Sequence, residues 1–478
     1  MNRRAKIVAT IGPASQDENS LRQLITAGVN VARINFSHGT HEDHAAVIQR
    51  VRRIAEQLDQ PLTILQDLQG PKIRTGEIKN GQVELKNGQA LTLITEEVEG
   101  DANTVSVDYA ELPQSVSTGG RILLDDGNLE LVVTAVGTNS VETEVLLGGT
   151  LKPHKGVNLP GASLNIRTFT TKDQADLKFG LAHKVDTIAL SFVRSAEDIT
   201  HLREIINNLN PERSNTPIIA KLERPEALEN LHAIIHAADG VMVARGDLGV
   251  EMSPEMVPVA QKEIIQMANR HAKTVITATQ MLESMMNSPR PTRAEASDVA
   301  NAIFDGSDAV MLSGETAVGK YPLKTVEMMA SIISTAEAHM REWGHGKIEL
   351  SQDMPHDNAL FITRAAHEMA LDKEVAAIAV FTQSGRTARL MSKTRPGVPV
   401  LAFTPETETY RRMGLVWGVT PYQVPHADTV EEMLAHVEAA MIAETAIQPG
   451  QEVVLLAGFP MGAHGPANFA LLHTIGQR

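Results

Sequence analysis

Polar side chains with catalytic potential stand where six short apolar runs of the chain end. The runs end in the segments NFSHG, QDLQG, KLERPE, ARGDLG, ATQM and LSGET. Residues two apart in a strand face the same side, so Lys221 and Glu223 share one face. Glu223 and Asp247 end successive runs, and neighbouring strands lie about 4.8 Å apart. Two carboxylates that converge in this way suit Mg²⁺ or Mn²⁺, which prefer oxygen ligands.

Positive charges accompany these carboxylates. The planar guanidinium of Arg33 can bind a phosphate as a fork. Lys221, beside the expected ion, could neutralise charge on a transferring phosphoryl group or on a developing enolate. Two simpler explanations stay open. Arg33 could form a structural ion pair at a strand end, and Glu223 with Asp247 could be a solvated acid pair.

The remaining strand ends add polar groups to the same centre. Gly246 and Asp247 open a short helix, where free backbone N–H groups would hold a small carboxylate. Thr279 ends the seventh run and could touch the same ligand or relay a proton. Ser313 and Glu315 stand two residues apart at the end of the eighth run. Each signal alone is weak, and their convergence from six strand ends favours one reactive centre.

The runs that carry these residues alternate with amphipathic, helix-like segments such as residues 17–28. Near-continuous apolar strands that alternate with helices indicate a parallel sheet covered on both faces. Eight such units predict an α/β fold, the (β/α)8 TIM barrel, whose reactive residues gather at the carboxyl ends of its strands. We expect residues 1–70 and 170–345 to form this barrel.

Two further domains interrupt and follow the barrel pattern. Residues 71–169 are rich in Gly, Val, Thr and Leu at strand spacing, and they predict an antiparallel β domain, a small β-barrel inserted as a lid over the reactive face. Their paired turn signals are Asn80-Gly81, Asn87-Gly88 and Asp126-Gly127. Residues 346–478 contain a helix, then a strand, loop, helix and strand, and a closing apolar run, QEVVLLAGFP. This order predicts a C-terminal α/β regulatory domain.

The segment TQSGRT, residues 382–387, joins a strand to a helix in this last domain. Hydroxyl groups, a glycine and an arginine at a helix start can form a phosphate cradle. The simpler explanation is a helix N-cap with an arginine facing solvent. We expect a phosphorylated effector, a sugar monophosphate or AMP, to bind the residues Thr382, Ser384, Gly385, Arg386 and Thr387.

Composition limits the classes of partner and compartment. The 478 residues carry a formal net charge of -15, which argues against nucleic acid or an anionic membrane as a partner. The absence of cysteine excludes disulfides, thiolate metal sites and a cysteine nucleophile. The chain has neither a signal-peptide pattern at its start nor an apolar run long enough to span a membrane. A cytoplasmic protein is therefore expected.

Two segments resemble functional motifs without matching them, and one histidine has more than one possible role. GETAVGKY nearly matches a phosphate-binding P-loop, but Tyr321 stands where Ser or Thr must hold Mg²⁺. HEDH, residues 41–44, lacks the spacing of a zinc-protease motif and is expected to open a helix. His38 has two open readings, a hydrogen-bonded loop residue or a contact to a nucleotide.

Together these segments resemble the pyruvate kinase family. NFSHG, DLQGPKIRTG, KGVNLPG, AKLERPE, ARGDLG, ATQMLESM and PTRAEASDVANAIFDGSDAVMLSGETAVGKYP fall in the family's order from residue 4 to about 340. The resemblance implies phosphoryl transfer from phosphoenolpyruvate to ADP, which gives pyruvate and ATP. It also implies Mg²⁺ (or Mn²⁺), a phosphorylated allosteric effector and a homotetramer.

The resemblance implies a role for each matching residue. Lys221 corresponds to the lysine that stabilises the transferring phosphoryl group, and Arg33 to an arginine on the phosphate. The expected Mg²⁺ ligands are Glu223 and Asp247, and the expected substrate-carboxylate site is Gly246, Asp247 and Thr279. The monovalent-cation ligands would be Asn35, Ser37 and Asp67, and the nucleotide contacts would be Asn35, His38, Arg74 and Lys155. Ser313 and Glu315 correspond to a proposed proton relay to the enolate carbon.

The sequence departs from the potassium-dependent members of the family at three positions. Those members have a glutamate at the position of Lys72, and a threonine and a lysine at Leu68 and Gln69. Leu68 lacks the side-chain oxygen that a cation site would use, and the Lys72 ammonium can supply a positive charge. The chain resembles the potassium-independent branch, with Lys72 in place of K⁺.

Two other functions would account for part of this pattern. A metal-dependent aldolase acting on pyruvate enolate would also use a barrel, paired carboxylates and an arginine. It would not need the inserted domain, Lys155 or a nucleotide site. A metabolite sensor on an inactive barrel would lack the reactive residues, whereas Lys221, Glu223, Asp247 and Thr279 are all present.

Overall fold

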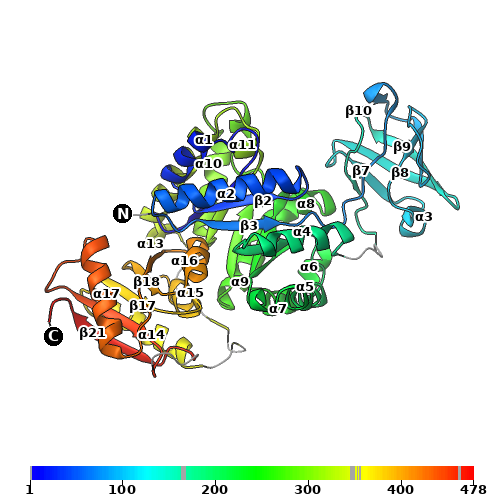
Figure 1. The fold of residues 1–478 in the computed structure, drawn as a ribbon. Coiled ribbons are helices and arrows are strands. Elements are labelled where there is room, and N and C mark those ends of the chain that lie inside the picture. The colour runs from blue at the N-terminus through cyan, green and yellow to red at the C-terminus, as the bar shows by residue number, and fades with distance from the viewer. Residues whose placement is uncertain are drawn as a thin grey trace.

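The eight apolar runs form a closed parallel barrel (Figure 1). The computed structural model describes residues 3–162, 168–344, 350–351, 354, 357–460 and 465–477. Hydrogen bonds join the barrel strands in the order β1-β16-β15-β14-β13-β12-β3-β2. The strands are β1 (Lys6–Thr10), β2 (Val31–Asn35), β3 (Thr63–Asp67), β12 (Thr187–Leu190), β13 (Ile218–Leu222), β14 (Gly240–Ala244), β15 (Thr274–Ala278) and β16 (Ala309–Leu312). The predicted (β/α)8 barrel is therefore confirmed.

These strands are apolar along their whole length because both of their faces are covered. Side chains such as Val8, Leu65 and Met242 fill the barrel interior, and the opposite faces pack against the surrounding helices. The longer surrounding helices are α1 (Glu18–Thr26), α2 (His41–Gln57), α4 (Thr171–Ala182), α5 (Ala196–Leu209), α9 (Val257–Arg270), α10 (Arg293–Phe304) and α12 (Pro322–Ala338). Shorter helices are α6 (Pro225–Glu229), α7 (Leu231–Ala237), α8 (Arg245–Glu251), α11 (Gly314–Ala317) and α13 (Met340–Trp343).

Local sequence signals fix where several of these helices begin. Thr40, Thr170 and Thr292 each cap a helix, and the acidic residue three positions later bonds back to the cap. This capping box satisfies N–H groups that the first helical turn leaves without partners. HEDH opens α2 as expected, because Thr40 precedes it.

The lid domain leaves the barrel after β3 and forms a separate β structure. One sheet has the order β11-β7-β8-β9-β5-β6, and β4 pairs with β10 in a second sheet of two strands. The strands are β4 (Val83–Leu85), β5 (Ala90–Ile94), β6 (Thr104–Ser106), β7 (Arg121–Leu124), β8 (Leu129–Val136), β9 (Ser140–Leu147), β10 (Gly149–Leu151) and β11 (Val157–Asn158), with the short helix α3 (Leu112–Ser115). Bridges from Arg74 to Gly156, beside β11, and from Thr75 to Val107, beside β6, join the two edges of the larger sheet, so the expected small β-barrel is confirmed.

Two details of the lid domain differ from the expectation of antiparallel strands joined by paired turn residues. β5 and β6 run parallel, because the intervening segment 95–103 crosses back before β6 begins. Of the three paired turn signals, Asp126-Gly127 joins hydrogen-bonded neighbours, β7 and β8. Asn87-Gly88 lies between β4 and β5, which pair with other strands. A turn dipeptide thus fixes a local reversal, and the packing of the domain decides which strands pair.

The C-terminal domain is a five-stranded sheet of order β19-β18-β17-β20-β21. Its strands are β17 (Ala377–Phe381), β18 (Val400–Thr404), β19 (Val419–Gln423), β20 (Glu452–Ala457) and β21 (Phe469–Thr474). Its helices are α14 (Asn358–Asp372), α15 (Arg386–Lys393), α16 (Thr407–Arg412) and α17 (Val430–Glu444). The expected α/β domain is confirmed, and an edge strand, β21, follows the closing run and is antiparallel to it. Residues 345 and 346, where the domain boundary was expected, lie outside the described residues.

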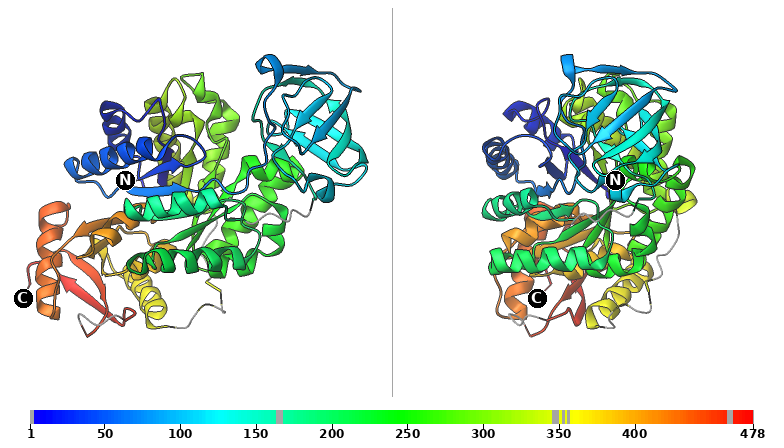
Figure 2. Two further views of the ribbon diagram at one scale, coloured as in Figure 1. Left: turned by 45° about the vertical axis from the view of Figure 1, so that its right-hand side comes forward. Right: turned by 90° about the vertical axis from the view of Figure 1, so that its right-hand side faces the viewer.

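The lid domain and the C-terminal domain lie at opposite ends of the barrel (Figures 1 and 2). Leu415, in a short 3-10 helix (Met413–Leu415), belongs to the cluster that fills the barrel interior, and Thr63 Oγ1 donates to the Arg411 carbonyl. The C-terminal domain is therefore packed against the barrel, not tethered to it.

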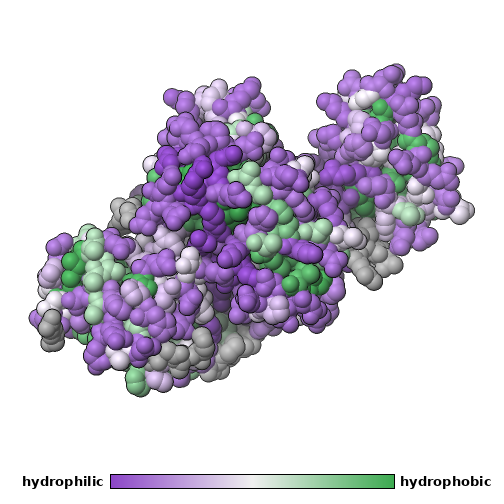
Figure 3. All heavy atoms as spheres, viewed as in Figure 1, coloured by the Kyte–Doolittle hydropathy of each residue, from purple (hydrophilic) through white to green (hydrophobic). Residues whose placement is uncertain are grey.

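Polar residues cover most of the face shown in Figure 3, and apolar residues form separate smaller areas on it. None of the described helices is long and apolar enough to cross a membrane.

Candidate active site

Lys221 is the centre of a buried charge network at the carboxyl ends of the barrel strands. Its Nζ lies 3.2 Å from Asp67 Oδ1 and 2.9 Å from Glu223 Oε1, and it donates to Ser191 Oγ at 2.6 Å. Arg33 Nε donates to Asp67 Oδ2 at 2.6 Å. The ion pair to Oδ1 lacks hydrogen-bond geometry, so this buried oxygen has no hydrogen-bond partner among the described residues. Asp67 thus retains a lone pair for a further donor or cation.

The network fixes the charge of its members. Burial alone would lower the pKa of Lys221, but Asp67 and Glu223 outweigh that effect and raise the pKa above its usual range. Burial alone would raise the pKa of Asp67, yet Lys221 and Arg33 hold it below its usual value. Lys221 is therefore an ammonium and Asp67 a carboxylate at neutral pH.

Of the two carboxylates that pair with Lys221, Glu223 is the one whose ionised form is less stabilised. Burial raises its pKa, Lys221 opposes the rise, and the negative charge of Asp247 adds to it. Glu223 Oε2 accepts the Phe192 N–H at 2.6 Å, while Asp247 stands in the first turn of α8 and is partly exposed. Two carboxylates that repel each other beside a cavity are a suitable oxygen donor set for a divalent ion.

Thr279 and Gly246 meet at the expected carboxylate site. The Gly246 N–H donates to Thr279 Oγ1 at 2.7 Å, so this N–H is already bonded, although the sequence argument expected it to be free. Arg245 Nη2 donates to the Thr279 carbonyl at 2.7 Å. Thr279 has a φ of 71°, a region that costs a β-branched residue about 1–3 kcal/mol. Backbone strain of this kind is concentrated at functional sites.

Ser313 and Glu315 are adjacent but differ in exposure. Both oxygens of Glu315 accept backbone N–H groups, from Ser313 at 2.7 Å and from Leu282 at 3.2 Å, and Glu315 is buried. Ser313 is partly exposed. The hydroxyl of Ser313 is therefore the better placed of the two to exchange a proton with a ligand, while the carboxylate of Glu315 anchors the loop.

The expected nucleotide contacts are divided between the barrel and the lid domain. Asn35 Oδ1 accepts the Ser37 N–H at 3.1 Å on the barrel side. His38 is exposed nearby, and burial together with the charges of Arg74 and Lys72 lowers its pKa. On the lid side, Arg74 Nη1 donates to the His154 carbonyl at 3.1 Å, and Lys155 Nζ pairs with Asp125 Oδ1 at 2.7 Å.

A cavity separates the lid domain from the barrel, and Lys72 lies in its wall. The residues that line it include Lys72, Asp126, Gly156, Arg194, Asp247 and Glu251. Among the described residues, the cations in contact with Asp67 are Arg33 and Lys221. Lys72, which was expected to lie close to Asp67, instead lies within electrostatic reach of His38 and lines the same cavity as Asp247.

The loop expected to bind an effector has the predicted place between β17 and α15. Gly385 has a φ of 77°, and its N–H donates to Thr382 Oγ1 at 3.0 Å. Arg386 is paired with Asp357 Oδ2 at 2.5 Å, and the Ser384 side chain is exposed. Thr387 is buried in the first turn of α15. The guanidinium of Arg386 therefore has a carboxylate partner that a phosphate would have to replace.

Ser191 and Thr10 belong to the network, although the sequence argument did not select them. Ser191 accepts from Lys221 and donates to the Leu68 carbonyl at 2.7 Å, and Thr10 Oγ1 accepts from Arg33 at 2.8 Å. Each stands at the end of a barrel strand, so its position could have been noticed. Hydroxyl side chains are common at strand ends, so the residue type alone does not identify Ser191 and Thr10 as members of the network.

Two family models match the chain. The model for the pyruvate kinase barrel domain matches residues 2–326, and the model for the pyruvate kinase alpha/beta domain matches residues 361–473. The chain belongs to the pyruvate kinase family.

Individual pyruvate kinases are similar over nearly the whole chain. A pyruvate kinase of Geobacillus stearothermophilus is 46% identical over 480 residues, which are 99% of this chain and 81% of that protein. Pyruvate kinase 2 of Synechocystis is 46% identical over 478 residues, covering 99% of this chain and 79% of that protein. The crystal structure of a Cryptosporidium parvum pyruvate kinase has a TM-score of 0.90 at 37% identity and covers 99% of this chain and 96% of that one.

Proposed function

We propose that this pyruvate kinase transfers the phosphoryl group of phosphoenolpyruvate to ADP, with Mg²⁺ (or Mn²⁺), without a requirement for K⁺ and under allosteric activation. The observation that carries the proposal is the position of Lys221 between Asp67 and Glu223, with Arg33 on the same Asp67. An ammonium held charged beside a divalent-ion site suits a reaction in which charge neutralisation does most of the work.

Glu223 and Asp247 would hold the divalent ion, which would supply charge neutralisation for the phosphoryl oxygens. Lys221 and Arg33 bind the phosphate and stabilise the charge that develops during transfer. Thr279, Asp247 and Gly246 would surround the substrate carboxylate, with the Gly246 N–H exchanging its bond to Thr279 Oγ1 for one to the ligand. Ser313 donates the proton that the enolate carbon gains. Arg74 and Lys155 would meet the nucleotide from the lid side, with Asn35 and His38 on the barrel side.

Steady-state kinetics with phosphoenolpyruvate and ADP test the reaction. We expect ATP and pyruvate to form in equal amounts. An aldolase would instead cleave or join a carbon–carbon bond of a pyruvate adduct and would ignore ADP. Failure to form ATP at saturating Mg²⁺ and both substrates would refute the proposed reaction.

Replacement of Asp247 by asparagine is expected to lower turnover steeply without loss of the fold, because one of two carboxylates for the ion is removed. The same assay should show that the wild type needs more Mg²⁺ as the pH falls. Because the pKa of Glu223 is raised, a proton competes with the ion at a higher pH than it would at an ordinary glutamate. Turnover and the Mg²⁺ concentration at half-maximal rate are measured, with the exposed Glu255→Gln as control. Unchanged activity of Asp247→Asn at saturating Mg²⁺ would exclude this ligand.

The wild type is expected to run at nearly full rate in buffer free of K⁺ and Na⁺. Lys72 lines the cavity shared with Asp247 and influences His38, which supports its role as the resident positive charge. Lys72→Glu reverses the charge, so its rate should fall and K⁺ should restore part of it. Lys72→Gln, which only removes the charge, is the matched control and should respond to K⁺ less. If the wild type requires K⁺, Lys72 does not replace the cation.

Activation by a phosphorylated effector, a sugar monophosphate or AMP, is assigned to the loop 382–387. The exposed hydroxyl of Ser384 and the left-handed Gly385 at the start of α15 support a phosphate cradle. Ser384→Ala with Thr387→Ala should abolish activation and leave the unactivated rate unchanged. Rates with and without each effector are compared, and activation that survives in the double variant would place the effector elsewhere. The homotetramer remains a prediction, which sedimentation would test.

A further inference from the structure

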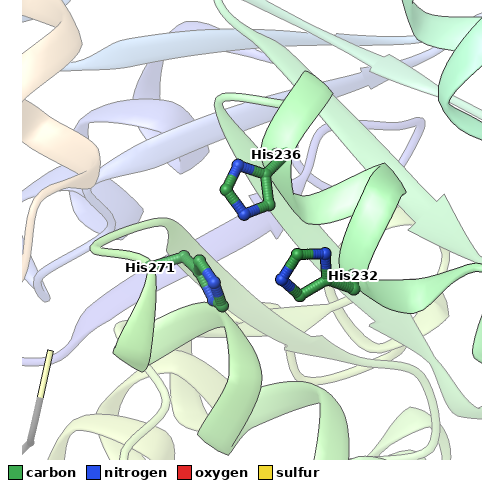
Figure 4. A group of neighbouring side chains, drawn as sticks. All are labelled: His232, His236 and His271. Carbon is green, nitrogen blue, oxygen red and sulfur yellow. The ribbon is translucent and has the colours of Figure 1, made fainter. Parts of the chain in front are cut away.

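Three histidines form a cluster on the outside of the barrel, away from the candidate active site (Figure 4). His232 and His236 are four residues apart on α7, so they lie on one face of that helix. His271 follows α9 as its C-cap residue. Nitrogen atoms of all three rings lie within 4.8 Å of one another. The ring centroids are 4.6, 5.2 and 4.8 Å apart, and Figure 4 shows the rings facing a common space.

The environment of His271 prepares one of its nitrogens for a ligand. His271 is buried, and its Nδ1 lies 2.9 Å from the Met267 carbonyl oxygen. A carbonyl can only accept, so Nδ1 carries the hydrogen, which makes Nε2 the nitrogen that would bind a metal ion. Histidines that bind metals usually donate their other N–H to a carbonyl or a carboxylate in this way, which fixes both tautomer and ring orientation.

The electrostatic setting also favours a cation. His236 lies in the last turn of α7 and His271 caps α9, so two helix C-termini point at the cluster. Each C-terminus carries a partial negative charge that stabilises nearby cations. The positive charge of Lys273 works against cation binding. Its Nζ donates to the carbonyls of Ala238 at 2.6 Å and His236 at 3.2 Å.

Neutral imidazoles select a particular class of ion. Three nitrogen donors suit Zn²⁺, Ni²⁺ or Cu²⁺, whereas Mg²⁺ prefers oxygen ligands. Zn–N bonds of about 2.0–2.1 Å place tetrahedral donors roughly 3.3 Å apart, so the cluster must contract. His232 and His236 are exposed and can turn toward the fixed ring of His271.

We propose that His232, His236 and His271 form a binding site for a transition-metal ion, with Zn²⁺ as the preferred occupant. The site is distinct from the carboxylate pair Glu223 and Asp247. The ends of α7 and α9 precede β14 and β15, so the histidines lie at the opposite end of the barrel. The neighbouring residue Ala272 packs against Leu360 and Leu390 of the C-terminal domain. A bound ion would therefore link two barrel helices beside the domain interface.

The test uses the full chain without an affinity tag, after treatment with a chelator and return to excess Mg²⁺, which occupies the carboxylate site. Co²⁺ is added as a spectroscopic substitute, because its visible absorption is intense in tetrahedral nitrogen sites and weak for the hydrated ion. Zn²⁺ is then titrated calorimetrically. We expect one equivalent of each ion to bind and Zn²⁺ to displace Co²⁺.

Variants identify the ligands. His232→Ala and His236→Ala alter exposed side chains and should weaken Zn²⁺ binding by at least about tenfold, since even loss of an outer partner of a ligand costs that much. His426→Ala removes an exposed histidine outside the cluster and should bind as the wild type does. The proposal is overturned if the wild type gives no tetrahedral Co²⁺ spectrum. It is equally overturned if the double variant His232→Ala with His236→Ala still binds one Zn²⁺ with wild-type affinity.

Discussion

Replacement of Lys221 by methionine is expected to lower kcat by about 10³-fold or more, the range over which a single charge-neutralising residue acts in phosphoryl transfer. Methionine preserves much of the side-chain volume and removes the charge that Asp67 and Glu223 hold in place. The loss should fall mainly on kcat, because the interaction grows as charge develops in the transition state.

The stability of the Lys221→Met variant needs a separate measurement. Glu223 would lose its cationic partner, whereas Asp67 would keep Arg33. We therefore expect a lower melting temperature as well, and kinetics should be measured well below it. Lys178→Met, a change at an exposed lysine of α4, serves as control. A kcat of the Lys221→Met variant within tenfold of the wild type would contradict the assigned role.

The pH dependence of Lys221 gives a further check. Its raised pKa keeps the ammonium charged through the alkaline range in which an ordinary lysine would lose its proton. The wild type should therefore not lose activity through this group between about pH 8 and 10. On the acidic side, the proton that Glu223 gains is the expected cause of decline.

Replacement of Asp308 by asparagine is expected to destabilise the protein by about 3–5 kcal/mol, the usual cost of removing one partner from a buried ion pair. Asp308 precedes β16 and is buried. Its carboxylate pairs with Lys393 Nζ at 2.5 Å and Arg395 Nη2 at 2.8 Å, both from the C-terminal domain. The variant would leave Lys393 buried without a carboxylate.

The effect should depend on pH in a defined direction. Burial alone would raise the pKa of Asp308, but Lys393 and Arg395 outweigh it and hold the pKa below its usual range. Such a carboxylate stabilises the fold fully above its unfolded pKa of about 3.9, and the stabilisation disappears as pH falls through the folded pKa. The part of the stability difference that comes from the ionised carboxylate of Asp308 should shrink below about pH 4.

A second substitution distinguishes two contributions to the loss of stability: the buried charge of Lys393 left without a carboxylate, and the loss of the contact itself. Burial lowers the pKa of Lys393 to about 8, and Asp308 opposes this shift. Adding Lys393→Met to Asp308→Asn removes the buried cation, so the double variant should recover much of the stability. Denaturant and thermal unfolding of all variants measure the effect. A single variant as stable as the wild type, or a double variant no better than the single, would show that the pair does not hold the domains together.

This ion pair also adjoins the helix that begins at the proposed effector loop. Lys393 ends α15, and the loop 382–387 precedes the same helix. Asp308 precedes β16, and Ser313 follows it at the other end of the barrel. Activation should therefore be measured in the Asp308 and Lys393 variants alongside stability. The helix α15 begins at the proposed effector loop and ends at Lys393, which pairs with Asp308 of the barrel.

Local pattern in the sequence determined the barrel and the ends of its strands. Each barrel strand is apolar on both faces and ends in polar residues, so periodicity alone locates Lys221 and Glu223 at a strand end. Capping residues such as Thr40 determine helix starts, because the cap and its partner are only three residues apart. These features depend on neighbours in the chain, and the chain records them directly.

Contacts between distant segments were decided by the tertiary structure. Asp67 pairs with Arg33 and Lys221, although Lys72 is nearer in sequence. β21 adds an edge strand, β6 runs parallel to β5, and the segment 74–75 closes the lid sheet, because strand pairing depends on where the intervening segments cross. His271 meets His232 and His236 only because α7 and α9 end side by side. Periodicity reports which face of an element is buried, and packing of whole elements decides which side chains meet there.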